Sequence, residues 1–525
     1  MNYGFIIDNR RCIGCHACTV ACKAEHDTPI GVNRTWVKYV EKGVFPETRR
    51  VFTVHRCNHC EDAPCVEICP VRSLYVRPDG IVDFDRERCI GCKACMQACP
   101  YDALHIDPDT RTSTKCNYCA HRIDRGLEPA CVIVCPVHAI ISGDVDDPHG
   151  EIGSLLNRTS VSVRKPEKHT RPKLFYVDAD AAALRPEMAP SNAGYPQAEQ
   201  AAGVGHFAGK TGTGLDGLLK LLPYSAERLA QAEGKVRAET GQARRAYDIP
   251  QRGVLWDWEV SGYLWTKSIA AGVMFLPLLL HLSGLMTMRP RLQVGLALVS
   301  LIFLGLTGLL LVKDLDQPGR FLYVLLRPQW RSWLVRGAYI IAAFGGLTTL
   351  WLLLVLVGLG EAPWLMALLV VLAVLAAVYT AFLLAQCRGR DLWQSPLLPA
   401  RMLVSSAMTG GAVVLLASLL GDMGVQRTVL VALELAIVVH LLLVAFELFM
   451  PHGSTDSTLA MGMMVRGVLR VPFWSALVLG NLLPLALLLL SANGLWVLPA
   501  CVLVLLFSLV SEHVWVRAPQ LIPLS

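Results

Sequence analysis

The sequence predicts two parts of different fold class: a cysteine-rich α+β domain, followed by an all-α polytopic membrane domain of eight transmembrane helices. Three observations support this. Sixteen of the 18 cysteines precede residue 136. Hydrophobic residues make up 53% of the sequence and the mean hydropathy is +0.44, which is too apolar for an ordinary soluble protein. Apolar runs of about twenty residues, long enough to cross a bilayer, follow one another after Trp256.

The sixteen cysteines fall into four groups of four. The third group, CIGCKACMQACP (89–100), has the spacing C-x2-C-x2-C-x3-C-P, in which three thiolates bind one [4Fe–4S] cluster and the fourth binds another. Such a run needs a second run elsewhere, and sixteen thiolates are enough for four cubane clusters. The groups are Cys12, Cys15, Cys18 and Cys22; Cys57, Cys60, Cys65 and Cys69; Cys89, Cys92, Cys95 and Cys99; and Cys116, Cys119, Cys131 and Cys135.

Zinc and disulfides are the alternative uses of these cysteines. Zinc sites normally use two C-x2-C pairs separated by a longer loop, whereas these runs crowd more thiolates together than a tetrahedral ion needs. Disulfides would require export, and the start MNYGFIIDNRRC has neither the apolar region nor the cleavage site of a secretory signal. The net charge of +6 lies largely in loops between apolar segments, so we expect no nucleic-acid partner.

Residues 1–150, with all sixteen cysteines, resemble the four-cluster ferredoxin subunit found beside molybdenum or tungsten bis-pterin enzymes such as dimethyl sulfoxide reductase, polysulfide reductase, formate dehydrogenase and nitrate reductase. The resemblance implies a ferredoxin-like α+β fold, four [4Fe–4S] clusters and a molybdenum- or tungsten-pterin catalytic subunit as partner. Stretches 80–84 and 103–107 are expected to form its short strands. Some relatives have tryptophan at the position of Cys92 and hold a [3Fe–4S] centre. Because cysteine stands here, we expect all four clusters to be [4Fe–4S].

The resemblance also implies that the cysteine groups exchange ligands. It places the cluster of Cys12 and Cys135 at the catalytic partner, and the cluster of Cys69 and Cys89 next to the membrane. The four implied ligand sets are Cys12, Cys15, Cys18 and Cys135; Cys22, Cys116, Cys119 and Cys131; Cys57, Cys60, Cys65 and Cys99; and Cys69, Cys89, Cys92 and Cys95.

Basic residues beside the ligands are candidates for tuning reduction potentials, because nearby positive charge favours the reduced cluster. They are Lys23, Arg88, Lys93 and Lys115. The alternative is that each is a solvated surface charge.

Residues 151–252 are rich in Ala, Gly, Pro and charge, which predicts an extended linker. Within it, residues 215–239 have the apolar periodicity of a helix, although Pro223 interrupts it. The membrane domain, the third segment after 1–150 and this linker, is therefore expected at 253–525.

Eight spans of sufficient length are expected in this third domain, near 260–286, 292–312, 334–359, 364–386, 400–420, 426–450, 470–490 and 495–516. Eleven basic residues lie in or near loops on the N-terminal side and three on the opposite side. By the positive-inside rule the cluster domain faces the cytoplasm, at the cytoplasmic (inner) membrane.

The aromatic entry WDWEVSGYLWTKSIAAG (256–272) and the loops KDLDQPGRF (313–321) and RPQWRSW (327–333) resemble the NrfD-like membrane subunit of polysulfide reductase. The resemblance implies a haem-free anchor that reacts with a quinone, menaquinone or ubiquinone. A quinone needs an apolar slot with polar groups at its two oxygens. The candidates are Tyr263, Lys267, Asp314 and Arg320; the alternative is that Lys267 pairs within the bundle and that Asp314 and Arg320 brace their loop.

In the sixth span, His440 and Glu447 are seven residues apart and share a helical face, while Glu434 is offset. These three are candidates for a proton route, or for a buried hydrogen-bond cluster. A haem anchor is a rival interpretation that would need His281 and His440 to face each other. Cys387 and Cys501 belong to no cluster group and are expected to be packing residues.

Together these observations predict an electron-transfer and membrane-anchor subunit. It would pass electrons between membrane quinone and a separate catalytic subunit, so the chemistry of the terminal substrate lies elsewhere. One alternative is a charge-translocating module resembling alternative complex III. Another is a membrane scaffold for a soluble ferredoxin.

Overall fold

The computed structural model describes residues 1–525 except 45, 190–242, 250–251, 421–426 and 491–495. The protein divides into two compact units, which are described separately. The first comprises Met1–Leu255 with the short segments Cys387–Arg390 and Pro523–Ser525, and the second comprises Trp256–Gln386 and Asp391–Ile522.

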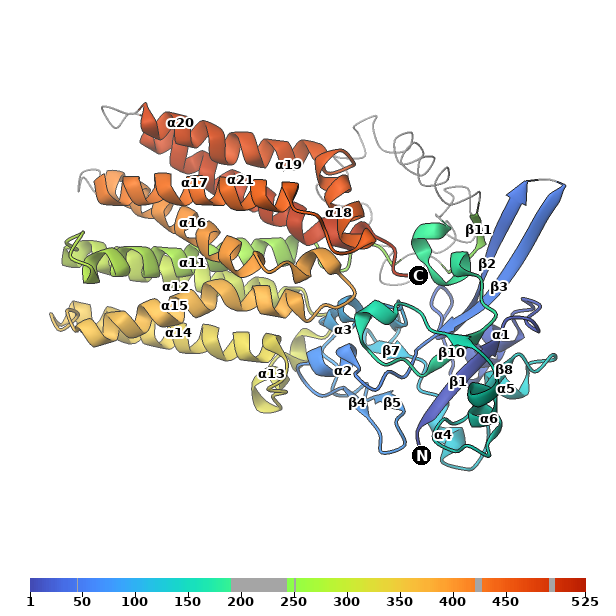
Figure 1. Cartoon of the computed structure of the whole chain (residues 1–525). Coiled ribbons are helices and arrows are strands. Elements are labelled where there is room, and N and C mark those ends of the chain that lie inside the picture. The colour runs from blue at the N-terminus through green and yellow to red at the C-terminus, as the bar shows by residue number, and fades with distance from the viewer. Residues whose placement is uncertain (45, 190–242, 250–251, 421–426, 491–495) are drawn as a thin grey trace. The chain divides into compact units, whose positions relative to one another are not determined.

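The main sheet of the first unit has the strand order β8-β1-β10-β9, of which β8, β1 and β10 are labelled in Figure 1. Strand β1 (Tyr3–Asp8) pairs antiparallel with β8 (Ile140–Asp144) and parallel with β10 (Leu174–Val177), which in turn pairs with β9 (Val161–Ser162). Five of the six β1 residues are buried because both faces of the sheet are covered. Helix α6 (Glu151–Arg158) packs on the face that carries Ile6.

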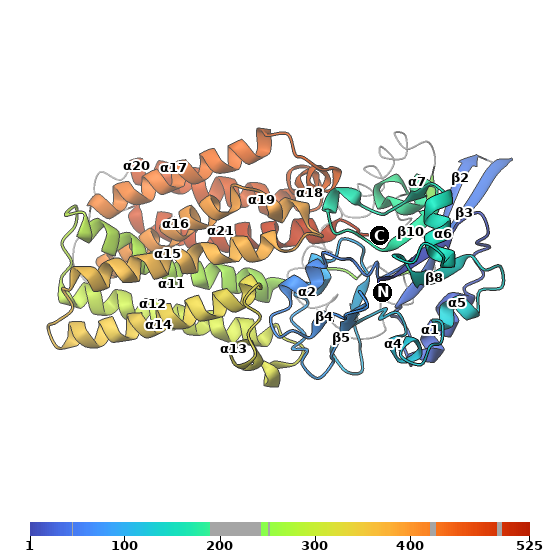
Figure 2. The same ribbon diagram turned by 60° about the horizontal axis from the view of Figure 1, so that its bottom comes forward.

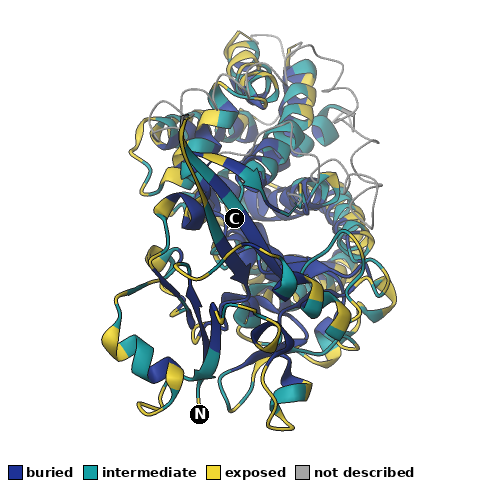
Figure 3. Ribbon diagram, turned by 90° about the vertical axis from the view of Figure 1, so that its right-hand side faces the viewer, coloured by how far each residue is buried: buried dark blue, intermediate teal, exposed yellow. Residues whose placement is uncertain are grey.

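A second sheet has the order β11-β2-β3, from Arg244–Tyr247, Thr35–Val44 and Glu47–Arg56. Strand β3 runs from exposed residues at its start to buried residues at its end (Figure 3). Two hairpins follow, β4 (Leu74–Val76) with β5 (Val82–Phe84), and β6 (Leu104–Ile106) with β7 (Ser113–Lys115). Strands β5 and β6 lie within the predicted stretches 80–84 and 103–107, and the ferredoxin-like α+β fold is confirmed.

Short helices carry the cysteines or directly follow them between these strands. They are α1 (Ala17–Glu25), α2 (Pro64–Ile68), α3 (Ala94–Ala98), α4 (Ala120–Ile123) and α5 (Ala130–Ile133).

The structure differs from the prediction of an extended linker over 151–252. Residues 151–189 form α6, β9, β10, α7 (Ala181–Leu184) and the 3-10 turns Pro166–Lys168 and Pro186–Met188, and β11 returns to the second sheet. Composition misled the prediction because β10 is only four residues long within a stretch rich in charge, Ala and Pro, yet it completes the sheet beside β1. The helix predicted at 215–239 lies outside the described residues.

The second unit contains, among its described residues, eight helices long and apolar enough to cross a membrane (Figure 2). This confirms a multi-pass, all-α membrane domain. The seventh span is continuous but changes from α19 through a π-helical segment, Val478–Leu482, to α20. The helices are α11 (Trp258–Leu282), α12 (Pro290–Lys313), α14 (Trp333–Leu356), α15 (Pro363–Ala385), α16 (Leu398–Leu420), α17 (Arg427–Phe449), α19 (Arg470–Leu477) with α20 (Leu483–Leu489), and α21 (Val497–Arg517).

Helix α11 is the centre of this unit. In its apolar 18-residue stretch, 83% of the residues are buried. The helix packs against α12, α15, α16 and α21. Its backbone approaches α16 very closely, because a Cβ built on Gly272 would lie 1.8 Å from the Ser406 carbonyl oxygen. Small residues at such crossings let membrane helices pack through their backbones.

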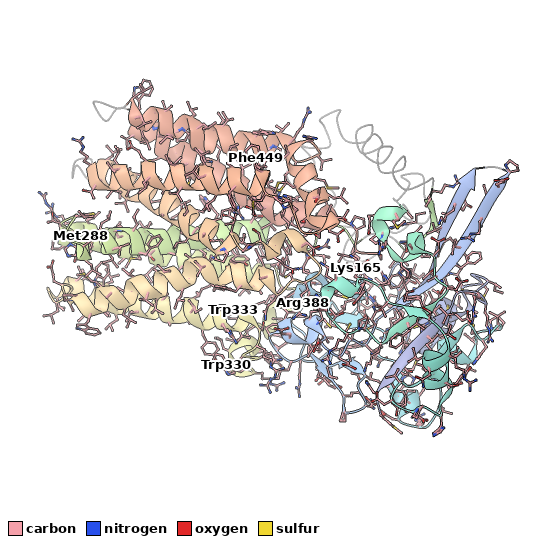
Figure 4. The ribbon with its side chains drawn as sticks, in the orientation of Figure 1. Lys165, Met288, Trp330, Trp333, Arg388 and Phe449 are labelled. Atoms are coloured by element: carbon pink, nitrogen blue, oxygen red, sulfur yellow. The ribbon has the colours of Figure 1, made fainter. Side chains whose placement is uncertain are left out.

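The two ends of the helix bundle carry different connections. Met288 lies at one end, and Trp330 and Trp333 lie at the other (Figure 4). Trp333 stacks on Phe382 with ring centroids 4.6 Å apart. The second end also carries α13 (Tyr323–Leu326), α18 (Thr455–Val465) and the 3-10 turns Pro318–Arg320, Asp391–Gln394 and Ala518–Leu521. Tryptophan at span ends is typical of a membrane–water interface.

Candidate functional site

The backbone around the four cysteine groups repeats one turn. In every group, the residue just before the second cysteine has a left-handed backbone, with φ of 70° at Gly14, 44° at His59, 70° at Gly91 and 62° at Tyr118. Left-handed conformations are uncommon for residues other than glycine. Their recurrence at one position indicates a shared requirement, since such turns gather backbone N–H groups around an anionic centre.

Twelve of the sixteen group cysteines are buried. The exceptions are Cys12, Cys92 and Cys135, which are half-buried, and Cys15, which is exposed. Burial raises the pKa of the Cys18 and Cys119 thiols to about 12 and that of Cys99 to about 11. Free thiols here are therefore protonated at neutral pH, and a metal centre must displace those protons when it binds.

The cysteines interact across the sequence groups. In each case the fourth cysteine of one group is an electrostatic neighbour of cysteines from another group. The donor chemistry fits cubane clusters, whose four thiolates bind four separate irons, and no three such side chains among the described residues converge on a single-ion position. The neighbours are Cys135 and Cys15 for Cys12; Cys116, Cys131 and Cys119 for Cys22; Cys99, Cys57 and Cys60 for Cys65; and Cys92, Cys89 and Cys69 for Cys95.

Hydrogen bonds reach several of these sulfurs. The backbone N–H of Ala139 donates to Cys135 Sγ at 3.2 Å, and that of Ser113 donates to Cys89 Sγ at 3.3 Å. Arg56 Nη1 donates to Cys131 Sγ at 3.0 Å. Because hydrogen bonds to the sulfurs help to set the potential of an iron–sulfur cluster, these groups are candidate tuning residues. Sequence reasoning missed Arg56.

The basic residues singled out from the sequence differ in burial. Lys115 is fully buried, and its ammonium donates to the carbonyl oxygens of Val82 and Cys116. Lys93 is buried as well, and half-buried Lys23 donates to the Pro29 carbonyl oxygen at 3.0 Å. Arg88 is 47% exposed and pairs with Asp85 at 3.0 Å, as a surface charge does.

In the membrane domain, Lys267 is buried on α11 and faces α15. Its Nζ donates to the Ala377 carbonyl oxygen at 3.0 Å and to Thr380 Oγ1, and lies 4.7 Å from the centre of the Tyr379 ring. These partners lie on another span from the other predicted quinone residues. Of those, Tyr263 and Asp314 are buried and Arg320 is half-buried.

Three further polar residues on α16 and α21, Arg401, Ser405 and Glu512, were not identified from the sequence as site residues. Glu512 on α21 accepts a hydrogen bond from Ser405 on α16 at 3.4 Å. The guanidinium of Arg401 lies 4.0 Å from the Trp515 ring centre. The signal was an acidic residue, Glu512, inside the predicted span 495–516.

The sixth-span candidates separate into two kinds. His440 and Glu447 are both buried, consistent with a shared face, whereas Glu434 is half-buried. His440 Nδ1 lies 2.9 Å from Asn481 Oδ1. Both carboxylate oxygens of Glu447 lack a hydrogen-bond partner among the described residues.

The remaining sequence predictions concern histidine and cysteine. His281, the other histidine that a haem anchor would require, has its Nδ1 at 3.0 Å from the Met286 carbonyl oxygen. Cys501 packs in the main hydrophobic core of the membrane unit, as expected of a packing residue, and Cys387 is fully buried.

Comparison with known proteins gives matches for both parts of the sequence. Residues 11–74 and 48–145 each match a 4Fe–4S dicluster domain family, and residues 250–523 match the family described as polysulphide reductase, NrfD. A tetrathionate reductase subunit of Salmonella typhimurium is 46% identical over 190 residues, which are 35% of this protein and 76% of the relative. A polysulfide reductase polypeptide of Wolinella succinogenes is 43% identical over 180 residues, 33% of this protein and 93% of the relative. The arsenate respiratory reductase iron–sulfur subunit ArrB of Shewanella sp. is 32% identical over 225 residues, 34% of this protein and 96% of the relative.

The NrfD match covers just over half of the sequence, and the three relatives are each matched over most of their length. The protein therefore belongs to the NrfD polysulphide-reductase family and carries, fused ahead of that domain, an iron–sulfur subunit of the tetrathionate and polysulfide reductase type.

Proposed function

We propose that this protein moves electrons between a membrane quinone and a separate molybdenum- or tungsten-pterin catalytic subunit, through four [4Fe–4S] clusters. The role of a membrane-bound electron-transfer subunit follows from the family. The quinone, the pterin partner and the four ligand sets belong to the proposal. We name these sets by their first member: the Cys12 set (with Cys15, Cys18, Cys135), the Cys22 set (with Cys116, Cys119, Cys131), the Cys57 set (with Cys60, Cys65, Cys99) and the Cys69 set (with Cys89, Cys92, Cys95).

The exposure of the Cys12 set is the observation that supports the proposal most. Cys15 is the one exposed member of the sixteen group cysteines. Large apolar side chains beside the members of this set are exposed too: Ile13 is 55% exposed, Val20 64% and Ile133 57%. Exposed apolar groups beside a redox centre favour docking of a protein partner. The proposed docking site of the catalytic subunit is therefore the surface around the Cys12 set.

Bound clusters supply a row of one-electron carriers. The protein's own residues hold and insulate them: buried strands and short helices exclude water from twelve of the ligand thiols. At the membrane end, Lys267 is the proposed donor to a quinone oxygen, held in position by α15. Tyr263, Asp314 and Arg320 are proposed to complete that quinone site.

The location is also part of the proposal. The excess of basic residues in loops on one side supports a cluster domain that faces the cytoplasm, in the cytoplasmic (inner) membrane. Protease cleavage of the first unit in sealed inside-out vesicles, and its protection in right-side-out vesicles, would be the expected pattern.

The test uses the full-length protein purified in detergent with whatever large subunit accompanies it. We expect about sixteen irons per molecule and reduction of the clusters by an added quinol. Lys267→Met should abolish quinol-driven reduction while dithionite still reduces the clusters. Lys313→Met is the matched control, since Lys313 ends α12 over the Trp258 ring. About four irons per molecule, or unchanged quinol reduction in Lys267→Met, would contradict the proposal.

A second candidate function is charge translocation, as in alternative complex III. It is favoured by the buried Glu447, which has no hydrogen-bond partner among the described residues. Proton uptake by vesicles during quinone turnover, lost in Glu447→Gln with electron transfer retained, would support it. Turnover without proton uptake in the wild-type protein would exclude it.

A further inference from the structure

Each cysteine group is preceded directly by a basic residue: Arg11, Arg56, Arg88 and Lys115. The structure divides them into two kinds. The side chains of Arg11 and Arg88 are 54% and 47% exposed and pair with aspartates. Arg56 and Lys115 are fully buried, because each is the last residue of a strand, β3 and β7 respectively, that ends inside the unit. The burial of this second pair requires an electrostatic explanation that the exposed pair does not.

Arg56 is buried without a carboxylate partner. Its Nη1 donates to Cys131 Sγ at 3.0 Å, and its guanidinium lies 4.5 Å from the centre of the Phe5 ring. Its Nε and Nη2 have no hydrogen-bond partner among the described residues, and it forms no ion pair with a described carboxylate. A guanidinium cannot lose its proton in a protein, so a full positive charge is buried here. Such a charge is costly unless negative charge lies close to it.

Cysteine thiolates of the proposed bound clusters would supply that negative charge. As thiolates, Cys131, Cys116 and Cys18 have the strongest electrostatic interactions with Arg56. Arg56 also interacts electrostatically with Cys22. Lys115, by contrast, is held by two backbone carbonyl oxygens. Cys131, Cys116 and Cys22 belong to one proposed ligand set, the Cys22 set, and Cys18 belongs to the Cys12 set. Arg56 therefore lies where two of the four sets meet.

We propose that Arg56 is a redox-tuning residue shared by the clusters of the Cys12 and Cys22 sets, and that its charge raises the reduction potentials of both. The inference rests on the ligand sets of the proposed function. Each cluster gains one negative charge when it is reduced, and a fixed cation in a buried, low-dielectric site stabilises the reduced form more than the oxidised form. Because one cation acts on both neighbours, it raises their potentials together and leaves the difference between them nearly unchanged.

A purely structural role makes a different prediction. The packing of the guanidinium on Phe5 would contribute to stability, and loss of that packing alone would not change the potentials of assembled clusters. Arg56→Lys retains the charge and loses the planar guanidinium, whereas Arg56→Met retains bulk and loses the charge. Arg11→Met is the matched control, because Arg11 holds the same position before the first cysteine group but is exposed.

The experiment measures iron content and midpoint potentials in the purified full-length protein, by redox titration followed with electron paramagnetic resonance. In Arg56→Met, two of the four potentials should fall by at least a tenfold change in the reduction equilibrium, about 59 mV for one electron. The Cys69-set cluster should stay unchanged, and the Cys57-set cluster, whose first ligand follows Arg56 in the sequence, should shift less than the first two. Arg56→Lys and Arg11→Met should resemble the wild type.

Each other outcome also decides the question. Four unchanged potentials in a fully loaded Arg56→Met protein would overturn the inference, and so would an equal shift of all four. If Arg56→Met loses iron and Arg56→Lys keeps it, the potentials are measured in Arg56→Gln, which is uncharged but retains hydrogen-bond donors; the same two potentials should fall there, and unchanged potentials would overturn the inference. If both variants lose iron, Arg56 acts through its shape and the inference fails. A wild-type protein without about sixteen irons would instead contradict the proposed function itself.

Discussion

Asn481 Oδ1 lies 2.9 Å from Nδ1 of His440, in a contact between the seventh and sixth membrane spans. The Asn481 amide nitrogen donates to the Ala476 carbonyl oxygen at 3.0 Å, so its oxygen is the acceptor and His440 Nδ1 carries the hydrogen. Asn481 belongs to the π-helical segment Val478–Leu482, where the seventh span departs from α-helical geometry. Segments of this kind are frequent at functional sites. This one fixes the tautomer of a buried histidine.

We expect Asn481→Leu to destabilise the membrane domain by about 1–3 kcal/mol, because it leaves a buried imidazole N–H without an acceptor. Asn481→Asp retains an acceptor oxygen and should lose less. Thermal unfolding in detergent measures both variants. Equal losses in the two would mean that the hydrogen bond to His440 contributes little.

Gly272→Ala should disrupt the contact between α11 and α16. A Cβ at this position would lie 1.8 Å from the Ser406 carbonyl oxygen, so the two backbones must separate. Overpacking of this kind costs about 1–3 kcal/mol or more. Gly305→Ala is the control on α12, since nothing lies within 4 Å of its built Cβ. A lowered melting temperature is expected for the first variant alone, and equal melting temperatures would refute the close crossing.

Cys22→Ser should perturb the cluster proposed for Cys116, Cys119 and Cys131, although Cys22 belongs to the first sequence group. Cys135→Ser should perturb the cluster proposed for Cys12, Cys15 and Cys18. The measurement compares the spectral components lost in the two variants, and they should differ. Cys501→Ser should retain all iron, because Cys501 packs in the apolar core. Loss of the same component in both ligand variants would argue against ligand exchange.

Tyr176→Ala should destabilise the cluster domain even though residue 176 lies beyond the cysteine groups. Tyr176 is fully buried on β10, and its hydroxyl donates to the Val54 carbonyl oxygen at 3.1 Å. Removing a buried aromatic side chain costs about 3–5 kcal/mol. The temperature at which cluster absorbance is lost should fall. Tyr75→Ala is the control at a partly exposed tyrosine and should leave that temperature nearly unchanged.

The architecture could be predicted from the sequence because its signals are strong and local. Thiolate spacing indicates the type of metal centre, and twenty-residue apolar runs indicate the spans. Single intramembrane charges such as Lys267 were recognisable for the same reason, since they are rare in apolar runs.

What could not be predicted depends on long-range pairing. Strand β10 joins β1 with Leu174 opposite Phe5, and no local sequence pattern announces a partner so far along the polypeptide. Arg56 looks like any basic residue beside a cysteine until its burial is known. Likewise, nothing in the local sequence shows that Lys267 bonds to α15 or that Asn481 faces His440, because helix packing brings these residues together.

The pairing of strand β11 with β2 is an intramolecular association. This strand comes from the stretch just before the membrane spans, yet it pairs with β2 and occupies the edge of a sheet in the cluster unit. An open strand edge is a site at which another polypeptide can add. Here the added strand is part of the same polypeptide. Its effective concentration at the sheet edge is therefore set by the covalent connection and does not fall when the protein is dilute. The cluster domain and its anchor therefore need no intermolecular affinity to stay associated.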